Sequence, residues 1–266
     1  MKRENKLRKI GQQCYLLSLL VRRNIKNQYY RSFIGVLWTV LNPLLNMLVM
    51  TLVFSQLFGR DVVGLDYSLY LLSGNIIFSI MRSSTSTSLP CLVNQRNMLQ
   101  KTRVSIALFP TANVLSSLVN FGFSFVALLI VALVRLAAGA YTFHWQIVLV
   151  VVLVPAVAIF SLGISYFLSA LYVFFRDIKH IYSVVLTLWT YLTPLFYTIE
   201  TLNNDFITKI MDFNPMYHYV EYMRDILQGI IPSTAEHILC YGFALASFLI
   251  GYIFLRAVKN RIAAQL

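Results

Sequence analysis

The side chains in this sequence that could do chemistry are few and widely separated. Its four histidines, His144, His180, His218 and His237, form no H-E-x-x-H pair and no ligand cluster with the three cysteines. No glycine is followed by lysine, so the chain lacks the phosphate-binding G-x-x-x-x-G-K-[ST] loop. The sequence therefore predicts a protein without a catalytic residue, metal or cofactor of its own, which cannot hydrolyse a nucleotide by the P-loop route.

The few polar residues must be positioned by a framework that is mostly apolar. Of the 266 residues, 58% are apolar and 12% are charged, and the mean hydropathy is +0.70. A soluble domain is roughly one-quarter charged, so an ordinary water-soluble enzyme is excluded. A helix needs about 20 residues to cross the hydrocarbon core. The apolar segments predict an all-α membrane protein with six transmembrane helices, at 36–58, 68–89, 110–134, 147–174, 181–198 and 237–255.

The basic residues are distributed unevenly around these segments. A net charge of +12 would suggest nucleic acid as the partner of a soluble chain. With six spans, the segments on the side of the N-terminus hold seventeen Lys and Arg residues, and the other side holds four, Arg60, Arg135, Lys209 and Arg224. Cytoplasmic loops carry such an excess. We therefore expect a multi-pass membrane protein with both termini in the cytoplasm, surrounded by membrane lipids and without a nucleic-acid partner.

Two regions outside the spans have helical periodicity. Before the first span, apolar residues recur every three or four positions from Ile10 to Ile25 among Lys and Arg, which predicts an amphipathic helix in the membrane interface. A positively charged anchor is the alternative. The short apolar run Tyr15–Val21 is followed at once by two arginines, so we expect no cleaved signal peptide. Residues 199–236 predict short amphipathic or re-entrant outer helices. The expected domains are 1–35, 36–255 and a tail at 256–266.

A set of short motifs occurs in a fixed order on this frame. They are YYRSFIGVLWTVLNPLL at 29–45, LSG at 72–74, FRDI at 175–178, TPLFY at 193–197 and NP at 214–215. From about residue 15 to 256, the sequence resembles the permease subunits of type-2 ABC exporters of cell-surface polysaccharides, the family of O-antigen, capsule and wall teichoic acid exporters. Two positions depart from the family pattern: Val104-Ser105 replaces Phe-Pro, and Ile77-Phe78 stands where tryptophan is usual.

The resemblance implies that the chain lies in the bacterial inner membrane, and it implies the partners of the chain. It implies a homodimer bound to two copies of a cytoplasmic ABC ATPase, which binds ATP and Mg, with a lipid-linked glycan passing between the two permease subunits. A chain without a nucleotide site must receive this energy through a contact, and the best candidate is the loop between the second and third spans. A short helix there could seat apolar residues in a groove of the ATPase while its cations face acidic residues. The predicted coupling residues are Asn97, Met98, Leu99, Lys101 and Arg103. A loop that only fixes topology is the alternative.

Aromatic residues are the expected lining of a glycan conduit, because flat rings pack on the C–H faces of sugars. The candidates at the cytoplasmic mouth are Tyr30, Phe33 and Trp38, and those toward the outside are Trp189, Tyr191, Phe196 and Tyr197. Two cations, Arg31 and Arg82, could contact an anionic headgroup. The alternatives are interfacial belts or packing for the rings, a topology signal for Arg31 and a snorkelling side chain for Arg82.

Two other classes of function stay open from the sequence. One is a type-2 ABC exporter of a lipid or drug. The other is a membrane-embedded glycosyltransferase or acyltransferase, which would need polar catalytic residues in a cleft. The sequence offers no His-Asp or carboxylate pair for such a cleft.

Overall fold

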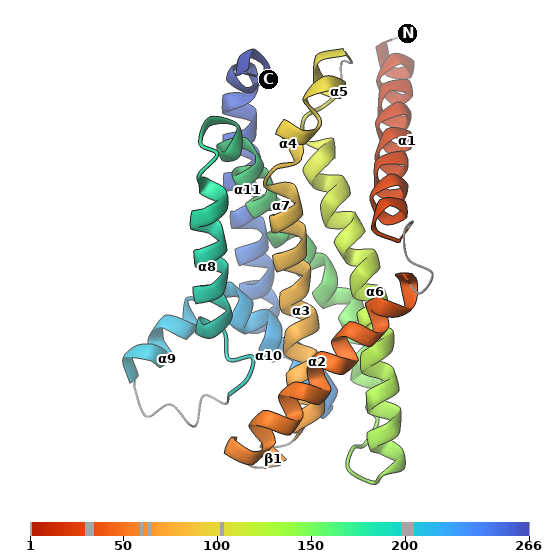
Figure 1. Ribbon diagram of the computed structural model, residues 1–266, viewed down its shortest axis with the longest axis vertical. Coiled ribbons are helices and arrows are strands. Elements are labelled where there is room, and N and C mark those ends of the chain that lie inside the picture. The colour runs from red at the N-terminus through yellow and green to blue at the C-terminus, as the bar shows by residue number, and fades with distance from the viewer. Residues whose placement is uncertain are drawn as a thin grey trace.

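The computed structural model describes residues 2–29, 35–58, 61–62, 65–101, 104–197 and 205–265. In this part of the chain the structure is almost entirely helical (Figure 1). The long helices are α1 (Lys2–Tyr29), α2 (Gly35–Phe58), α3 (Tyr67–Ser88), α6 (Leu108–Ala137), α7 (Val150–Phe174), α8 (Ile178–Leu192), α10 (Pro215–Gln228) and α11 (Thr234–Gln265). The short elements are β1 (Asp61–Val62), β2 (Leu65–Asp66), α4 (Cys91–Asn94), α5 (Arg96–Lys101), the 3-10 helix η1 (Trp145–Leu149) and α9 (Asp205–Asp212).

The predicted apolar segments coincide with α2, α3, α6, η1 with α7, α8 and α11. Within the described residues, Leu108–Ala137, Trp145–Phe174 and Thr234–Ile262 are long and apolar enough to cross a membrane, and Val40–Thr51 is a shorter apolar stretch. The prediction of an all-α membrane protein is therefore confirmed. The remaining predicted segments are less apolar for visible reasons, because α3 contains Arg82 and six consecutive Ser and Thr residues, and α8 is only 15 residues long.

Helix α3 runs through the centre of the main hydrophobic core. Its apolar side chains are almost completely buried against α6, α7 and α10. At its first turn, Asp66 accepts a hydrogen bond from the Ser68 backbone N–H at 3.0 Å and pairs with Arg135 at the end of α6. An acidic N-cap satisfies a free backbone donor and favours the helix dipole. The pair therefore joins the ends of two core helices that lie far apart in the sequence.

Helices α7 and α11 form the closest packing in the described structure. A Cβ added at Gly163 would overlap the backbone of Ser247, and one added at Gly251 would overlap the Gly163 carbonyl. Glycine is needed at both positions so that the two backbones can touch, a common device in membrane helix pairs.

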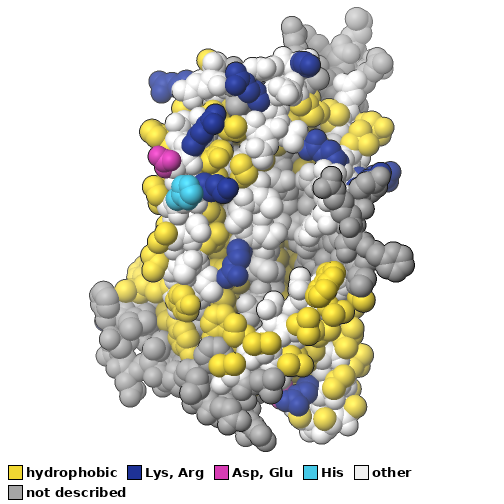
Figure 2. Space-filling model, in the orientation of Figure 1, with side chains coloured by type: hydrophobic (Ala, Val, Ile, Leu, Met, Phe, Trp, Pro, Cys, Tyr) yellow, Lys and Arg dark blue, Asp and Glu magenta, His cyan; other side chains and the backbone are white. Residues whose placement is uncertain are grey.

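The two ends of the molecule differ in what they carry. Both termini lie at the end that carries α4 and α5, and the other end carries β1 and the turn after α6 (Figure 1). On the face drawn in Figure 2, most of the Lys and Arg side chains gather at the first end, while hydrophobic side chains are dense toward the second. The two termini therefore share one end of the molecule, and the location of that end in the cytoplasm stays a prediction.

The outer and N-terminal regions are helical, as predicted, but their packing is more specific. In α10, the predicted apolar face is buried in the main core, including Tyr219 and Met223. Helix α1 packs along α6, and its apolar face lines a cleft of about 830 Å³ between the two helices. Whether α1 lies in a membrane interface stays a prediction.

Candidate functional site

A cavity of about 740 Å³ opens between α2, α3 and α8. Both polar and apolar side chains line it. Its polar lining residues are Asn42, Asn46, Asn75, Ser79, Arg82, Ser86, Ser124, Ser183, Thr187 and Thr190. Its apolar and aromatic lining residues are Pro43, Met47, Met50, Leu72, Ile76, Leu186, Tyr191 and Phe196.

The polar lining forms stripes along three helices. On α3, Asn75, Ser79, Arg82 and Ser86 follow one another at intervals of four, three and four residues. The stripe Ser183, Thr187, Thr190 on α8 has the same helical spacing, and Asn42 and Asn46 are one turn apart on α2. Residues three or four positions apart share one face of a helix. Each helix therefore turns a polar face to the cavity from an otherwise apolar segment.

Arg82 is the one charged residue among the described lining residues. Its Nη2 donates a hydrogen bond to the hydroxyl of Thr190 on α8 at 2.8 Å, and the guanidinium lies 4.9 Å from the ring centre of Phe78. The Thr190 hydroxyl in turn donates to the Leu186 carbonyl at 2.7 Å. The side chain of Arg82 stays exposed, so a fixed positive charge faces the cavity.

The aromatic end of the cavity depends on the turn after α8. Tyr191 lies in the last turn of α8, which ends at Leu192, and Phe196 follows in the turn after Thr193-Pro194. The Tyr197 hydroxyl donates to the Tyr191 carbonyl at 2.6 Å, and the Tyr67 hydroxyl donates to the Phe196 carbonyl at 2.9 Å. These bonds hold the rings of Tyr191 and Phe196 beside the polar stripes.

Asn214 fixes the end of α8 against α10. Its buried side-chain oxygen caps α10 by accepting from the Met216 N–H at 3.1 Å, and also accepts from the Trp189 indole N–H at 2.7 Å. Its amide donates to the Thr193 hydroxyl at 3.0 Å. Pro215 suits the first turn of the helix, because a backbone N–H at this position would have no acceptor within the helix. The Asn-Pro pair is therefore the joint between the outer helices and the cavity wall.

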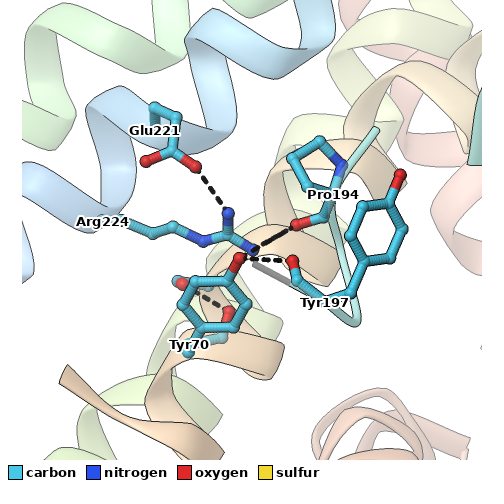
Figure 3. A network of polar contacts seen from close by, with 6 residues as sticks. Tyr70, Pro194, Tyr197, Glu221 and Arg224 are labelled. Atoms are coloured by element: carbon cyan, nitrogen blue, oxygen red, sulfur yellow. Dashed lines mark hydrogen bonds and ion pairs between the residues drawn. The ribbon is translucent and has the colours of Figure 1, made fainter. Parts of the chain in front are cut away.

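Behind the same turn lies a completely buried arginine on α10 (Figure 3). Arg224 Nη2 donates to the Pro194 carbonyl at 2.7 Å, Nη1 donates to Glu221 at 2.7 Å, and the guanidinium lies 3.5 Å from the ring centre of Tyr70. The Tyr70 hydroxyl donates to the Tyr197 carbonyl at 2.7 Å. Stacking and fork-like hydrogen bonding are typical uses of arginine where it is taken out of water. The network anchors the Pro194–Tyr197 turn to α3 and α10.

Asp225, the residue after Arg224, has a carboxyl group whose pKa is shifted by its surroundings. Burial, followed in effect by the charges of Glu236 and Glu221, raises the pKa of Asp225 to about 6, and Arg224 opposes this only weakly. No hydrogen bond to the Asp225 carboxyl is found among the described residues. This half-buried acid therefore changes its charge near neutral pH.

The predicted path residues fall into three groups. Arg82, Tyr191 and Phe196 line the cavity together. Trp189 packs edge-on against Phe160 and bonds Asn214, Tyr197 belongs to the turn network, and Trp38 is exposed on α2 outside the described lining. Tyr30, Arg31 and Phe33 lie outside the described residues. Their roles in a substrate path stay predictions.

The predicted coupling segment forms the short helix α5 at the end that carries both termini (Figure 1). Asn97 and Lys101 are exposed, whereas Met98 and Leu99 are half-buried against the second hydrophobic cluster of this chain. Part of their apolar surface is therefore already used within the chain. Arg103 lies outside the described residues, and the contact with an ATPase stays a prediction.

The amides and hydroxyls that line most of the cavity were not predicted from the sequence. Their signal was present, because polar residues at intervals of three and four recur inside apolar segments. The role of Arg224 was not predicted either, because its partners Pro194 and Tyr70 are distant in sequence.

Comparison with known proteins identifies the class of membrane protein to which this arrangement belongs. The family described as ABC-2 type transporter matches residues 15–227. An O-antigen export system permease protein RfbA of Myxococcus xanthus is 33% identical over 211 residues, 79% of each chain. A Klebsiella pneumoniae protein of the same name is 26% identical over 254 residues, 94% of this chain and 95% of its own. The polysialic acid transport protein KpsM of Escherichia coli is 20% identical over 234 residues, 87% of this chain and 89% of its own. The chain is a transport permease and belongs to the ABC-2 type transporter family.

Proposed function

We propose that this chain is the transmembrane subunit of an ATP-driven exporter that moves a lipid-linked polysaccharide of the O-antigen, capsular or teichoic-acid type across the bacterial inner membrane. The observation that carries the proposal is the cavity between α2, α3 and α8, with polar stripes beside the rings of Tyr191 and Phe196. Amides and hydroxyls exchange hydrogen bonds with sugar hydroxyls, and rings pack on sugar C–H faces. Relatives named as O-antigen export permeases support this cargo.

The proposal includes a homodimer, which the open side of the cavity supports. The helices that form its walls also expose large apolar side chains, including Leu48 and Val49 on α2 and Val184 and Leu188 on α8. Either lipid or a second protein surface must cover them. A second copy placed against α2 and α8 would close the open side of the cavity, so that two half-conduits form one path.

The topology in this proposal has six spans and both termini in the cytoplasm. The predicted spans coincide with helices, and the termini share one end with α5. ATP and Mg would be bound by two copies of a separate ATPase at that end, because the chain has no P-loop. The purified chain alone is expected to have no ATPase activity and to gain it with this partner.

The decisive experiment is export in the bacterium that carries the gene. Deleting the gene should leave the surface polysaccharide inside the cell, and the intact gene should restore it to the surface. Replacing Asn42 and Asn46 with leucine, which keeps side-chain size and removes the amides, should restore much less, at normal protein level. Asn260→Leu, at an exposed position of α11 away from the cavity, is the matched control. Full export by the double variant would contradict the assignment of the cavity as the path.

The coupling assignment has a separate test. Leu99→Asp together with Lys101→Glu and Arg103→Glu should weaken co-purification of the ATPase and leave membrane insertion intact, because both the apolar and the charged contacts are reversed. Unchanged co-purification and unchanged export in this variant would remove α5 as the coupling helix. Lys259→Glu, exposed near the C-terminus, controls for a general effect of charge at this end.

A further inference from the structure

Arg82 has hydrogen-bonding capacity that the described structure does not use. A guanidinium carries five N–H donors. Among the described residues, one bond of Arg82 is found, from Nη2 to the Thr190 hydroxyl at 2.8 Å. The ring of Phe78 supports one face of the group, 4.9 Å from its centre. The group is thus held in place by α8 and by its own helix while several donors remain available to a ligand.

The surroundings of Arg82 favour an anion. Ser79 and Ser86 lie one turn away on the same face of α3, and Ser183 and Thr187 line the opposite wall on α8. The hydroxyls of Ser79 and Thr187 donate to carbonyls of their own helices, so among the described residues Ser86 and Ser183 keep a hydroxyl hydrogen for a phosphate oxygen. No carboxylate occurs among the described residues of the lining. A positive charge without an opposite charge, in a cavity with low-dielectric walls, attracts anions strongly.

The position of the charge shows which part of a substrate it suits. Arg82 lies six residues before the end of α3 at Ser88, or about 9 Å along the axis. That end leads directly into α4 and α5. On α3 the lining residues further from this end, Ser79 and Asn75, are neutral. A polymer with a charge on every repeat would need cations at several levels, whereas a single cation near one end suits one anionic group at one end of the substrate.

We propose that Arg82, positioned by its bond to Thr190, binds together with the hydroxyls of Ser86 and Ser183 the phosphate group that joins the glycan to its lipid. This inference rests on the proposed function and adds the chemical class that this part of the cavity recognises. The neutral stripe of Asn75 and Ser79 continues from the phosphate site along α3 and offers amide and hydroxyl groups to the sugars.

The test measures lipid binding without transport. The full chain is placed in phosphatidylcholine nanodiscs, and the binding of radiolabelled undecaprenyl pyrophosphate is compared for the natural chain, Arg82→Gln and Arg82→Lys. Loss of charge-assisted hydrogen bonds should weaken binding by about tenfold to a hundredfold in Arg82→Gln. Arg82→Lys keeps the charge and loses the fork, so it should weaken binding less. Arg256→Gln, at an exposed position of α11 outside the cavity, should bind as the natural chain does.

Two further lipids separate the sources of the phosphate. Undecaprenol has the same chain and no phosphate, and its weak binding should be equal in all variants. Phosphatidylglycerol should not displace the pyrophosphate lipid at equal concentration, and displacement would overturn the assignment to the lipid-linked glycan in favour of ordinary phospholipid. Equal binding of undecaprenyl pyrophosphate by the natural chain and Arg82→Gln would overturn the phosphate site altogether.

The binding result is independent of the export assay. If Arg82→Gln binds normally while the intact gene still restores surface polysaccharide, the phosphate site is wrong and the proposed function stands. If the intact gene restores no polysaccharide, the proposed function itself fails. A melting temperature of Arg82→Gln within a few degrees of the natural chain shows that reduced binding is not caused by unfolding.

Discussion

The chain places two arginines among its apolar helices and uses them in opposite ways. Arg224 is 1% exposed, with two hydrogen bonds through Nη1 and Nη2 and the ring of Tyr70 against its face. Arg82 is exposed to a cavity and has one hydrogen bond among the described residues. A buried charge is tolerated only when it is well partnered, whereas a charge at a cavity can keep donors for a ligand. The region around Arg224 holds the fold together, whereas the region around Arg82 is the one that we propose to contact the substrate.

The largest expected effect on stability comes from removing the buried cation. Arg224→Met should destabilise the chain by about 3 kcal/mol, because the buried Pro194 carbonyl loses its donor and the partly exposed Glu221 carboxylate loses its partner. For a chain of this size that corresponds to a melting temperature lower by about 6–12 °C. Thermal unfolding in detergent, followed by circular dichroism, measures it. Arg256→Met on the exposed side of α11 is the control, and an unchanged melting point of Arg224→Met would show that the network does not stabilise the fold.

The next effect comes from crowding the same network. A Cβ at Gly74 would lie 3.2 Å from Arg224 Nη2, 3.2 Å from Leu195 Cδ2 and 3.4 Å from Val220 Cγ1. Gly74→Val adds two methyl groups beyond that Cβ and should cost about 2 kcal/mol through overpacking. Gly122→Val, where nothing lies within 4 Å of the added Cβ, should change the melting point much less. Similar losses for the two variants would mean that glycine flexibility, and not packing on Arg224, sets the effect.

A smaller effect isolates one hydrogen bond. Tyr70→Phe removes the hydroxyl that donates to the Tyr197 carbonyl and keeps the ring against Arg224. The expected loss of stability is about 1 kcal/mol, the usual net value of one hydrogen bond. Tyr70→Leu should lose more, because it removes the ring as well. Equal melting points for Tyr70→Phe and Tyr70→Leu would show that the ring face contributes nothing to holding the cation.

The acid beside the network predicts a pH dependence. Because the pKa of Asp225 is raised to about 6 in the folded chain, above the ordinary value of 3.8, its negative form is disfavoured by folding. Stability should therefore rise as the pH falls from 7 through 6 toward 4, since the folded state takes up the proton first. The change should be smaller than that of Tyr70→Phe, because the group is only half-buried. Melting points of the natural chain and Asp225→Asn at pH 5 and pH 7 test this, and an equally steep dependence in both would exclude Asp225 as its source.

The smallest expected effect on stability belongs to the arginine in the cavity. Arg82→Met removes one hydrogen bond at an exposed position and should change stability by about 0.5 kcal/mol or less. The same variant should impair export, because the cavity loses its charge. A large drop in melting point would place Arg82 with Arg224, as a residue that holds the fold, and would remove the difference between the two regions.

Much of the helical framework was predictable from local patterns. Runs of apolar residues about long enough to cross a bilayer as helices predicted the positions of α2, α3, α6, α7, α8 and α11. The short helices in 199–236 were also expected. The burial of α10 was not, because the spacing of Tyr219 and Met223 fits an amphipathic helix on the surface equally well. The polar stripe Asn75, Ser79, Arg82 and Ser86 could have been identified from its spacing alone. The aromatic residues could not be sorted in this way, since Tyr191 lines the cavity while Trp189, two residues earlier, points to Asn214.

The sequence by itself determined which segments are apolar helices, which end of the chain is basic, and that no P-loop is present, because these properties depend on residue types and their local spacing. The tertiary structure alone decided which polar groups are used up and which remain available. Arg224 meets the Pro194 carbonyl 30 positions away and the ring of Tyr70 on another helix, while the stripes of α2, α3 and α8 converge on one cavity. A side chain's partners depend on how helices distant in sequence pack together, and local periodicity contains no information about that packing.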